Sequence, residues 1–288
     1  MSSDLDIAKC FEFAKELTLR AGKRLKCSFE DEKVVYNKDM GYGYMDFVTE
    51  YDHKIEKILI DGLSREFPDH KIIAEETIGT GEMPELTDAP TWIIDPIDGT
   101  HNFIHLFPHF CISVGLTVRK ELALGIIYNP SNSELYTAIK GKGAFLNGKS
   151  IHTSKVTELK KALIMLEPYI WKIGLVEDKN TQIPAMDALV KATHITRCIG
   201  SAALHLAYIA RGAADCFYLD THLKAWDVAA GTLILREAGG TVIDTKGGVY
   251  DIMKPNTIAA SNETLAREIS KLIIDTNLKT QRKRLQKT

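Results

Sequence analysis

Apolar positions recur at intervals of three and four residues in several stretches of the chain, and this spacing predicts amphipathic helices. The first helix is expected over residues 7–25, where Ser3 can cap its N-terminus. A second is expected over residues 55–67 and ends before Pro68, because proline cannot continue a helix. The same pattern predicts helices over residues 184–192, 201–211, 228–237 and 263–275.

Shorter apolar runs between turn-forming residues predict strands. The runs at residues 72–74 and 92–94 each end in acidic residues, so we expect buried strands that deliver carboxylates at their C-terminal ends. From residue 111 to 151 strand-like and turn-rich segments alternate, which favours an antiparallel meander. Residues 41–44, Gly-Tyr-Gly-Tyr, are interpreted as a mobile loop. Further strands are predicted at residues 162–166, 195–198, 215–219 and 257–261.

The order of these segments predicts an α/β protein. A length of 288 residues is compatible with two domains. No repeat period and no Pro/Gly/Ser-rich linker divides the chain, so one continuous two-sheet domain over residues 1–276 is favoured. Residues 277–288 are basic, with no acidic residue. We expect a disordered, solvated tail there, in preference to a nuclear-import or anion-binding segment.

Composition narrows the class of protein. Hydrophobic residues make up 45% and charged residues 26%, and the net charge is −2, which excludes a disordered chain and disfavours nucleic-acid and membrane-surface binding. The five cysteines form no Cys-x-x-Cys pair, which disfavours a disulfide framework or structural zinc site. No signal-peptide pattern and no apolar run of about 20 residues is present. A cytoplasmic protein is therefore expected.

Residues 92–100 read Trp-Ile-Ile-Asp-Pro-Ile-Asp-Gly-Thr and carry the strongest chemical signal. Pro96 is expected to end the strand, which places Asp95 and Asp98 together on one short turn, a costly arrangement unless a cation lies between them. A helix that starts at Gly99 and Thr100 directs free N–H groups outward, which favours a bound anion. A divalent cation with a phosphate satisfies both conditions, whereas the alternative is a plain turn rich in turn-forming residues.

Carboxylates occur at other strand ends and helix starts. Glu75 follows the strand at residues 72–74, Asp52 lies just before the second helix, and Asp227 opens the helix at residues 228–237. Each of them could instead be a helix cap or a solvated acid.

Four segments together, residues 46–52, 74–77, 95–100 and 226–231, closely resemble the inositol monophosphatase family. That family is a branch of the Mg²⁺-dependent, Li⁺-sensitive phosphatase superfamily, and the resemblance extends over residues 4–275. It implies a five-layer αβαβα sandwich of the sugar-phosphatase type and a homodimer. The implied reaction is hydrolysis of myo-inositol monophosphate, a phosphoric monoester, to inositol and phosphate.

The resemblance also implies two to three Mg²⁺ ions in each active site. Glu75, Asp95 and the backbone carbonyl of Ile97 would bind one ion. Asp95, Asp98 and Asp227 would bind a second, and Glu75 would support a third through waters. Ligand sets made only of oxygen atoms suit Mg²⁺.

For catalysis, the resemblance assigns phosphate binding to the amides of Gly99 and Thr100. The Thr100 hydroxyl, together with Asp52, would orient a metal-bound water for in-line attack on phosphorus. Asp52, Thr100 and Glu75 are thus the catalytic residues that the resemblance implies. Thr100 could instead be an ordinary residue at a helix start.

The substrate side of the site follows the family less closely. Gly200, Ser201 and Ala202 match the small-residue segment that lines the inositol pocket, and Asp98 and Asp227 are also expected to contact substrate.

Three features depart from the family pattern. Asp220 replaces a glutamate of inositol-specific members, so pocket size or hydroxyl preference is expected to differ, unless Asp220 only ends a strand. Lys38 is the nearest match to a loop lysine of the family. Glu167 and Tyr169 occupy the region of a missing pocket serine.

Parts of the sequence are also compatible with other functions. The same machinery could act on a bisphosphonucleotide, fructose 1,6-bisphosphate or a sugar 1-phosphate, whereas a binding protein without catalysis predicts a missing ligand, and none is missing. His101, His105 and His109 have helical spacing for zinc, but Pro108 interrupts that helix. His101 is instead expected at the rim of the phosphate loop. Residues 141–145 resemble a nucleotide loop only weakly and are interpreted as a hairpin turn.

Overall fold

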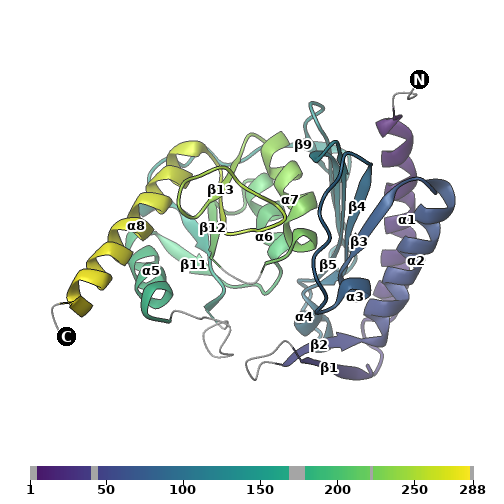
Figure 1. The fold of residues 1–288 in the computed structure, drawn as a ribbon, viewed down its shortest axis with the longest axis horizontal. Coiled ribbons are helices and arrows are strands. Elements are labelled where there is room, and N and C mark those ends of the chain that lie inside the picture. The colour runs from purple at the N-terminus through teal and green to yellow at the C-terminus, as the bar shows by residue number, and fades with distance from the viewer. Residues whose placement is uncertain (1–4, 40–44, 169–178, 221–222, 286–288) are drawn as a thin grey trace.

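Helices and sheets alternate in five stacked layers in the computed structural model, which describes residues 5–39, 45–168, 179–220 and 223–285 (Figure 1). One outer layer pairs α1 (Ile7–Cys27) with α2 (Glu50–Glu66), and the other pairs α5 (Lys179–Ala192) with α8 (Glu263–Leu285). Between the two sheets lie α6 (Ala202–Ala210) and α7 (Ala225–Glu237). The predicted αβαβα sandwich is confirmed.

The larger sheet has seven strands in chain order from β3 to β9. Only β3 and β4 are parallel, so the antiparallel meander predicted after residue 111 is confirmed. The strands are β3 (Lys71–Ala74), β4 (Thr91–Asp98), β5 (Cys111–Val118), β6 (Glu121–Asn129), β7 (Glu134–Ile139), β8 (Ala144–Leu146) and β9 (Lys149–Ile151).

The smaller sheet has the strand order β11-β10-β12-β14-β13. Its first three strands are parallel, so the chain leaves all three at the same edge. Strand β13 was not predicted, because four residues directly after a Gly-Gly pair carry too little pattern. The strands are β10 (Leu163–Met165), β11 (Ile195–Arg197), β12 (Cys216–Leu219), β13 (Thr241–Asp244) and β14 (Thr257–Ala260), and a 3₁₀ turn, η1 (Leu159–Lys161), precedes β10.

A two-stranded hairpin, β1 (Val35–Asp39) and β2 (Met45–Thr49), leads into α2 and was also not predicted. The loop predicted at residues 41–44 lies outside the described residues. Two short helices complete the fold: α3 (Glu75–Ile78) follows β3, and α4 (Thr100–Ile104) follows β4. Both begin where a strand of the larger sheet ends, which is where the sequence placed its acidic motifs.

The helical layers follow from the apolar pattern. On α1 the buried side chains include Ala14, Leu17 and Ala21, which repeat at intervals of three and four and join one core cluster with Leu59 of α2. Helix α7 is covered by both sheets and by α6, which is why it is apolar on nearly every side.

Four helix boundaries differ from the prediction by three residues or more. Helix α7 begins at Ala225 and not at Val228. Helix α2 begins at Glu50, so Asp52 lies in its first turn and not before it. Helix α5 begins at Lys179 and contains Pro184, which was predicted to start it. Helix α8 continues past Asp275 to Leu285, so residues 277–285, expected to be disordered, are helical. This stretch contains no glycine or proline to end the helix. The division of the chain into a domain and a tail remains a prediction.

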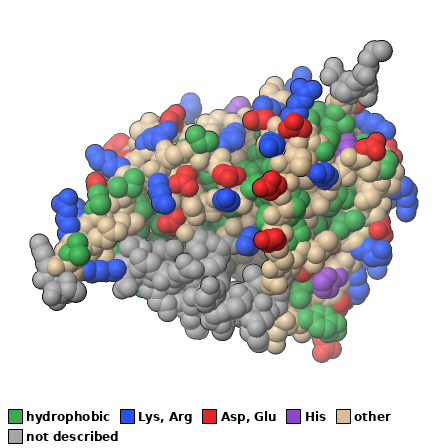
Figure 2. All heavy atoms as spheres, in the orientation of Figure 1, with side chains coloured by type: hydrophobic (Ala, Val, Ile, Leu, Met, Phe, Trp, Pro, Cys, Tyr) green, Lys and Arg blue, Asp and Glu red, His purple; other side chains and the backbone are tan. Residues whose placement is uncertain are grey.

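The surface matches the small net charge. Acidic and basic side chains are intermixed on the face shown in Figure 2, with no large area of one sign. None of the described helices is both long enough and apolar enough to cross a membrane. All five cysteines are free.

Candidate metal and phosphate site

An irregularity in β4 places Asp95 and Asp98 on one face of the sheet. Residues three apart on a regular strand point to opposite faces. Here Asp95 pairs with Ser113 and Asp98 with Cys111, so three steps along β4 match two steps along β5. The extra residue is a β-bulge, which turns both carboxylates to the same side. The expectation that Pro96 ends the strand was wrong, because a bulge accommodates proline within a sheet.

Asp227 completes an acidic cluster with Asp95 and Asp98. One carboxylate oxygen from each lies within 4.8 Å of the others, and no other set of three potential metal ligands occurs among the described residues. Asp227 lies in the first turn of α7, where its carboxylate accepts the Lys224 N–H at 2.6 Å. The cluster therefore joins the larger sheet to the central helix layer.

Burial and mutual repulsion disfavour the ionised form of these acids. Burial raises the pKa of Asp95 well above its usual value, and the neighbouring Glu75, Asp98 and Asp227 raise it further. Burial also raises the pKa of Asp98, although hydrogen bonds from Ser201 and Ala203 act against the change. Acids in such a cluster remain ionised together when a cation lies among them. The oxygen donors and their burial fit Mg²⁺.

Glu75 opens α3 next to Asp95, and the two carboxyl groups share a hydrogen bond. Glu56 of α2 supports this turn. Its carboxylate is 5% exposed and accepts the Glu76 N–H at 2.7 Å and the Thr77 hydroxyl at 2.6 Å. Sequence reasoning missed Glu56, although its place four residues after Asp52 puts both acids on one face of α2.

Asp52 and Thr100 meet next to the acidic cluster. One oxygen of Asp52 accepts the Thr100 hydroxyl at 3.0 Å, and the other accepts the N–H and hydroxyl of Thr49 at 2.7 and 2.6 Å. Thr49 and Asp52 form a capping box at the start of α2. The sequence analysis missed this role of Thr49, although the Thr-x-x-Asp spacing was visible. Burial raises the pKa of Asp52 to about 7.

Helix α4 begins at Thr100, as predicted. The Thr100 hydroxyl also lies 2.9 Å from the Ile97 carbonyl, the predicted backbone ligand. Gly99 adopts a φ of 93°, and a Cβ there would meet the His109 carbonyl oxygen at 2.9 Å. Only glycine fits this turn without strain.

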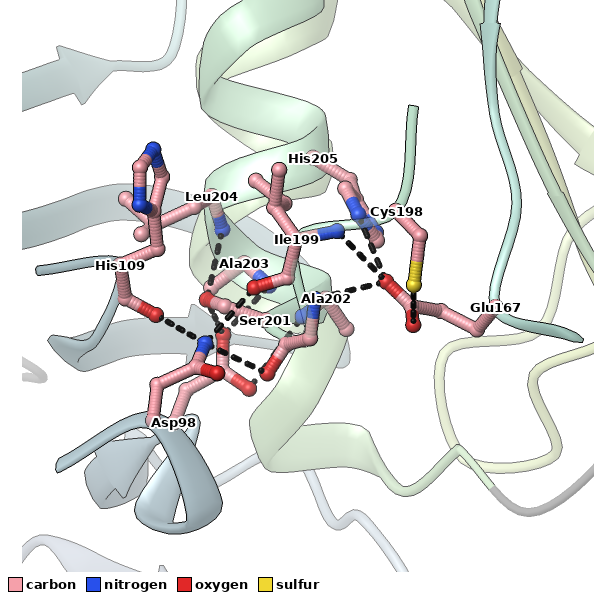
Figure 3. Close-up of polar contacts among 12 residues, drawn as sticks. Asp98, His109, Glu167, Cys198, Ile199, Ser201, Ala202, Ala203, Leu204 and His205 are labelled. Atoms are coloured by element: carbon pink, nitrogen blue, oxygen red, sulfur yellow. Dashed lines mark hydrogen bonds and ion pairs between the residues drawn. The ribbon is translucent and has the colours of Figure 1, made fainter. Parts of the chain in front are cut away.

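The start of α6 contacts Asp98 directly (Figure 3). Ser201, the N-cap residue, donates its hydroxyl to Asp98 at 2.5 Å, and the N–H of Ala203 donates at 2.7 Å. The Ala202 N–H lies 3.3 Å from the same carboxylate. The residues predicted to line the substrate pocket therefore also hold a predicted metal ligand.

Two predicted residues are placed less directly. Asp220 follows β12, and its carboxylate accepts the Thr245 hydroxyl at 2.6 Å. Burial raises the pKa of Asp220. Lys38 lies in β1, opposite Asp46 of β2. Tyr169 lies outside the described residues.

The weaker motifs have structural explanations. Helix α4 ends at Ile104, so the three histidines do not share a helix, and the His101 ring packs 5.0 Å from that of Phe47. In the hairpin turn at residues 141–143, the N–H groups of Gly141 and Gly143 each donate to Glu237 at 2.8 Å. This turn is therefore held by the protein's own carboxylate.

Comparison with known proteins identifies proteins that are similar to this chain. A model of the inositol monophosphatase family matches residues 6–276. Inositol monophosphatase 2 of Rattus norvegicus is 44% identical over 262 residues, which cover 90% of this chain and 87% of that protein.

Solved structures show the same fold. The IMPase of Thermotoga maritima has a TM-score of 0.81 at 31% identity, over 94% of this chain and 99% of that one. SaIMPase-II of Staphylococcus aureus, solved with inositol monophosphate bound, has a TM-score of 0.79 at 26% identity, over 97% and 100% of the two chains. The latter has also been solved with 2′AMP bound.

Proposed function

The chain belongs to the inositol monophosphatase family and is an inositol-phosphate phosphatase, and we propose that its reaction is the Mg²⁺-dependent hydrolysis of myo-inositol monophosphate to inositol and phosphate. The observation that carries the proposal is the combination of two features. A buried three-carboxylate cluster can hold divalent cations, and the Asp52–Thr100 pair lies beside it. A cation site alone would serve many functions, but this combination suits water attack on a phosphate ester.

The cation ligands follow from the site. Asp95, Asp98 and Asp227 would hold one Mg²⁺. Glu75 and the carbonyl of Ile97 would join Asp95 at a second position, with a weaker third ion near Glu75. Bound Mg²⁺ would supply positive charge to the phosphate and would lower the pKa of a water.

The chain's own groups orient the reactants. Gly99 and Thr100 would donate backbone N–H groups to the phosphate at the start of α4. The Thr100 hydroxyl can donate to Asp52 or to the Ile97 carbonyl, which leaves its oxygen free to accept from the attacking water. Asp52 would hold the hydroxyl in that orientation and accept the proton. No nucleophile from the protein is required.

The alcohol part of the substrate would lie against the loops at the carboxyl edge of the smaller sheet. Gly200, Ser201 and Ala202 follow β11, and Asp220 follows β12. Both strands run parallel to β10. Asp98 and Asp227 would face the same space. Lys38 remains the candidate for the lysine that supports the waters.

A second candidate is the same chemistry on another small phosphate: a bisphosphonucleotide, fructose 1,6-bisphosphate or a sugar 1-phosphate. Two observations support this second candidate. SaIMPase-II, of the same fold, binds 2′AMP as well as inositol monophosphate. Asp220 stands where inositol-specific relatives carry glutamate, and its carboxylate is engaged by Thr245.

Phosphate release from inositol monophosphates, nucleotides and sugar phosphates with Mg²⁺ tests the proposal. Wild-type protein should prefer inositol monophosphate. If Asp220 accepts a hydrogen bond from a ring hydroxyl, worth about 1.5–3 kcal/mol, Asp220→Ala should reduce this preference by roughly one to two decades. Asp220→Glu should keep or sharpen it. Equal losses on all substrates would mean that Asp220 only holds Thr245, and a preference for another ester would overturn the substrate assignment.

Two further properties belong to the proposal. We expect a homodimer, which sedimentation of the purified protein would test. We also expect a cytoplasmic enzyme, in keeping with the five free cysteines and a reducing compartment.

A further inference from the structure

The turn at residues 198–200, just before α6, lies between two buried carboxylates (Figure 3). Glu167, which follows β10, is 4% exposed, and Asp98, at the end of β4, is 8% exposed. Asp98 belongs to the proposed cation site. Glu167 belongs to the other sheet and has no part in the chemistry proposed above.

Glu167 holds the amide side of this turn. Its carboxylate accepts the N–H groups of Gly200 at 2.8 Å and Ile199 at 3.3 Å, and the Cys198 thiol at 2.9 Å. Successive N–H groups directed at one anion form a compact anion-binding turn. The Nε2 atom of His205, inside α6, lies 2.9 Å from the same carboxylate. Glu167 therefore connects β10 with both the turn and the helix that follows it.

These contacts keep Glu167 ionised in a buried position. Burial raises its pKa, but the contacts of His205, Cys198 and Gly200 outweigh this effect and leave the pKa below its usual value. A charge with this many partners is fixed in position, because any movement would leave a buried donor or acceptor unpaired.

Asn102 of α4 holds the carbonyl side of the same turn. Its Nδ2 atom donates to the carbonyl oxygens of Ile199 at 2.6 Å and Gly200 at 3.3 Å. Gly200 has a φ of 68°, and a Cβ there would lie 3.2 Å from the amide of Asn102. The turn is thus fixed by Glu167, which follows β10 of the smaller sheet, and by Asn102 of α4, which follows β4 of the larger sheet.

The position of this turn determines how Asp98 is held. Ser201 and Ala203 follow the turn directly and donate to one oxygen of Asp98, at 2.5 and 2.7 Å. A shift of the turn by a fraction of an ångström would move both donors together. The Asp98 carboxylate would then lose its orientation toward Asp95 and Asp227.

We propose that Glu167 is a positioning residue for the cation site: by fixing the turn at residues 198–200 it fixes the start of α6, and through it the Asp98 carboxylate. The inference rests on the proposed function, because it takes Asp98 as a cation ligand. It assigns to the smaller sheet a role in cation affinity in addition to its role in forming the substrate pocket.

The test is the affinity of full-length protein for Mg²⁺, measured by titration calorimetry without substrate. Glu167→Gln keeps the size of the side chain but loses its charge and one acceptor oxygen. Mutation of a residue that orients a metal ligand typically lowers metal affinity by about 10–100-fold, so the Mg²⁺ dissociation constant should rise by roughly that factor. In kinetic assays the activity lost at low Mg²⁺ should return at high Mg²⁺, with KM for substrate little changed.

Glu237→Gln is the matched control. Glu237 also binds two backbone N–H groups, those of Gly141 and Gly143, but in a hairpin turn outside the site. The Glu237→Gln variant should keep wild-type Mg²⁺ affinity even if its thermal stability is lower. If Glu167→Gln also kept wild-type Mg²⁺ affinity while losing stability, Glu167 would be a structural residue and the inference would be overturned.

A second variant covers the case in which Glu167→Gln does not fold. Gly200→Ala displaces the same turn from the Asn102 side and should raise the Mg²⁺ dissociation constant in the same way; an unchanged constant would overturn the inference. Failure of the proposed substrate remains distinguishable. A wild-type protein that binds Mg²⁺ but prefers another phosphate ester contradicts the substrate assignment, whereas the Mg²⁺ titrations still decide the role of Glu167.

Discussion

Asp52 shows how a single residue can combine burial with reactivity. Its side chain is 1% exposed, yet three hydrogen bonds from Thr49 and Thr100 favour its ionised form. Burial outweighs them and raises the pKa to about 7. A buried acid that titrates near neutral pH suits a proton acceptor. It also makes the stability of the protein depend on pH.

The metal-free protein should therefore lose stability as pH rises from about 4 to about 7. In this range the unfolded chain has already released the proton of Asp52, whereas the folded protein retains it, so rising pH favours unfolding. Asp95 and Asp98, whose pKa values are also raised, act in the same direction. Urea denaturation in EDTA measures the free energy of unfolding at each pH. The difference in this free energy between pH 4 and pH 7 should be smaller in Asp52→Asn by up to roughly 4 kcal/mol. An unchanged dependence would mean that Asp52 is ionised throughout.

Thr100→Ala tests the hydroxyl that Asp52 accepts. Because that hydroxyl is proposed to orient the attacking water, its loss should lower kcat by roughly 100-fold or more and leave KM within about threefold. Thr100→Ser, which keeps the hydroxyl, should restore most of the rate. Steady-state kinetics at saturating Mg²⁺ distinguish this outcome from a raised KM at normal kcat, which would assign Thr100 to phosphate binding alone.

The sequence predicted these residues to different extents. Asp95 and Asp98 could be predicted to lie together because they share one short turn, whereas the inclusion of Asp227 followed from the family resemblance. The means by which Asp95 and Asp98 share a face could not, because a bulge depends on the register of β5. Asn102 left no signal, since it donates to backbone carbonyls, two of which lie about 100 positions away in the chain.

Among the elements, α7 packs closely against β6 and so holds the central layer against the larger sheet. A Cβ added at Gly125 of β6 would lie 2.6 Å from the backbone oxygen of Ala230 and 3.1 Å from its Cα. These are backbone atoms of α7, which cannot rotate away. Asp227 lies one turn before Ala230 on the same helix. This contact therefore also fixes how close Asp227, a proposed metal ligand, lies to the larger sheet.

Gly125→Ala should therefore destabilise the protein by about 2–3 kcal/mol, the upper range for overpacking in a core. Gly248→Ala is the matched control, because a Cβ there meets nothing within 4 Å. It should change stability by less than about 0.5 kcal/mol. Urea denaturation of the two variants provides the comparison, and equal midpoints would show that α7 can move away from the sheet.

Element prediction succeeded where the pattern was long. The helices α1 and α7 were located by several turns of apolar spacing. Strands β1, β2 and β13 were missed because they mix polar with apolar residues, whereas the equally short β12 was located by its continuous apolar run. The extension of α8 was missed for another reason. Its last turns are polar and basic, and such a composition does not distinguish a solvated helix from a disordered tail.

At the scale of the whole molecule, the proposed cation site lies where separate parts of the fold meet. Asp95 and Asp98 come from the larger sheet, Asp227 from the start of α7, and the donors to Asp98 from the start of α6, which follows β11 of the smaller sheet. The layered arrangement could be predicted from the family resemblance. The contacts of Glu167 and Asn102 with one turn could not, because they depend on how the layers are placed against each other.

Mg²⁺ should accordingly stabilise the entire fold and not only a loop. A cation that binds the folded state at 100 times its dissociation constant adds about 2.7 kcal/mol. For a chain of this size the melting temperature should rise by about 4–5 °C relative to protein in EDTA. Asp227→Asn removes one repelling carboxylate and one ligand, so the metal-free variant should melt higher than metal-free wild type and respond much less to Mg²⁺. Calorimetric scans across a Mg²⁺ series measure both effects. An equal response in the two proteins would place the bound cation away from Asp227 and would contradict the proposed site.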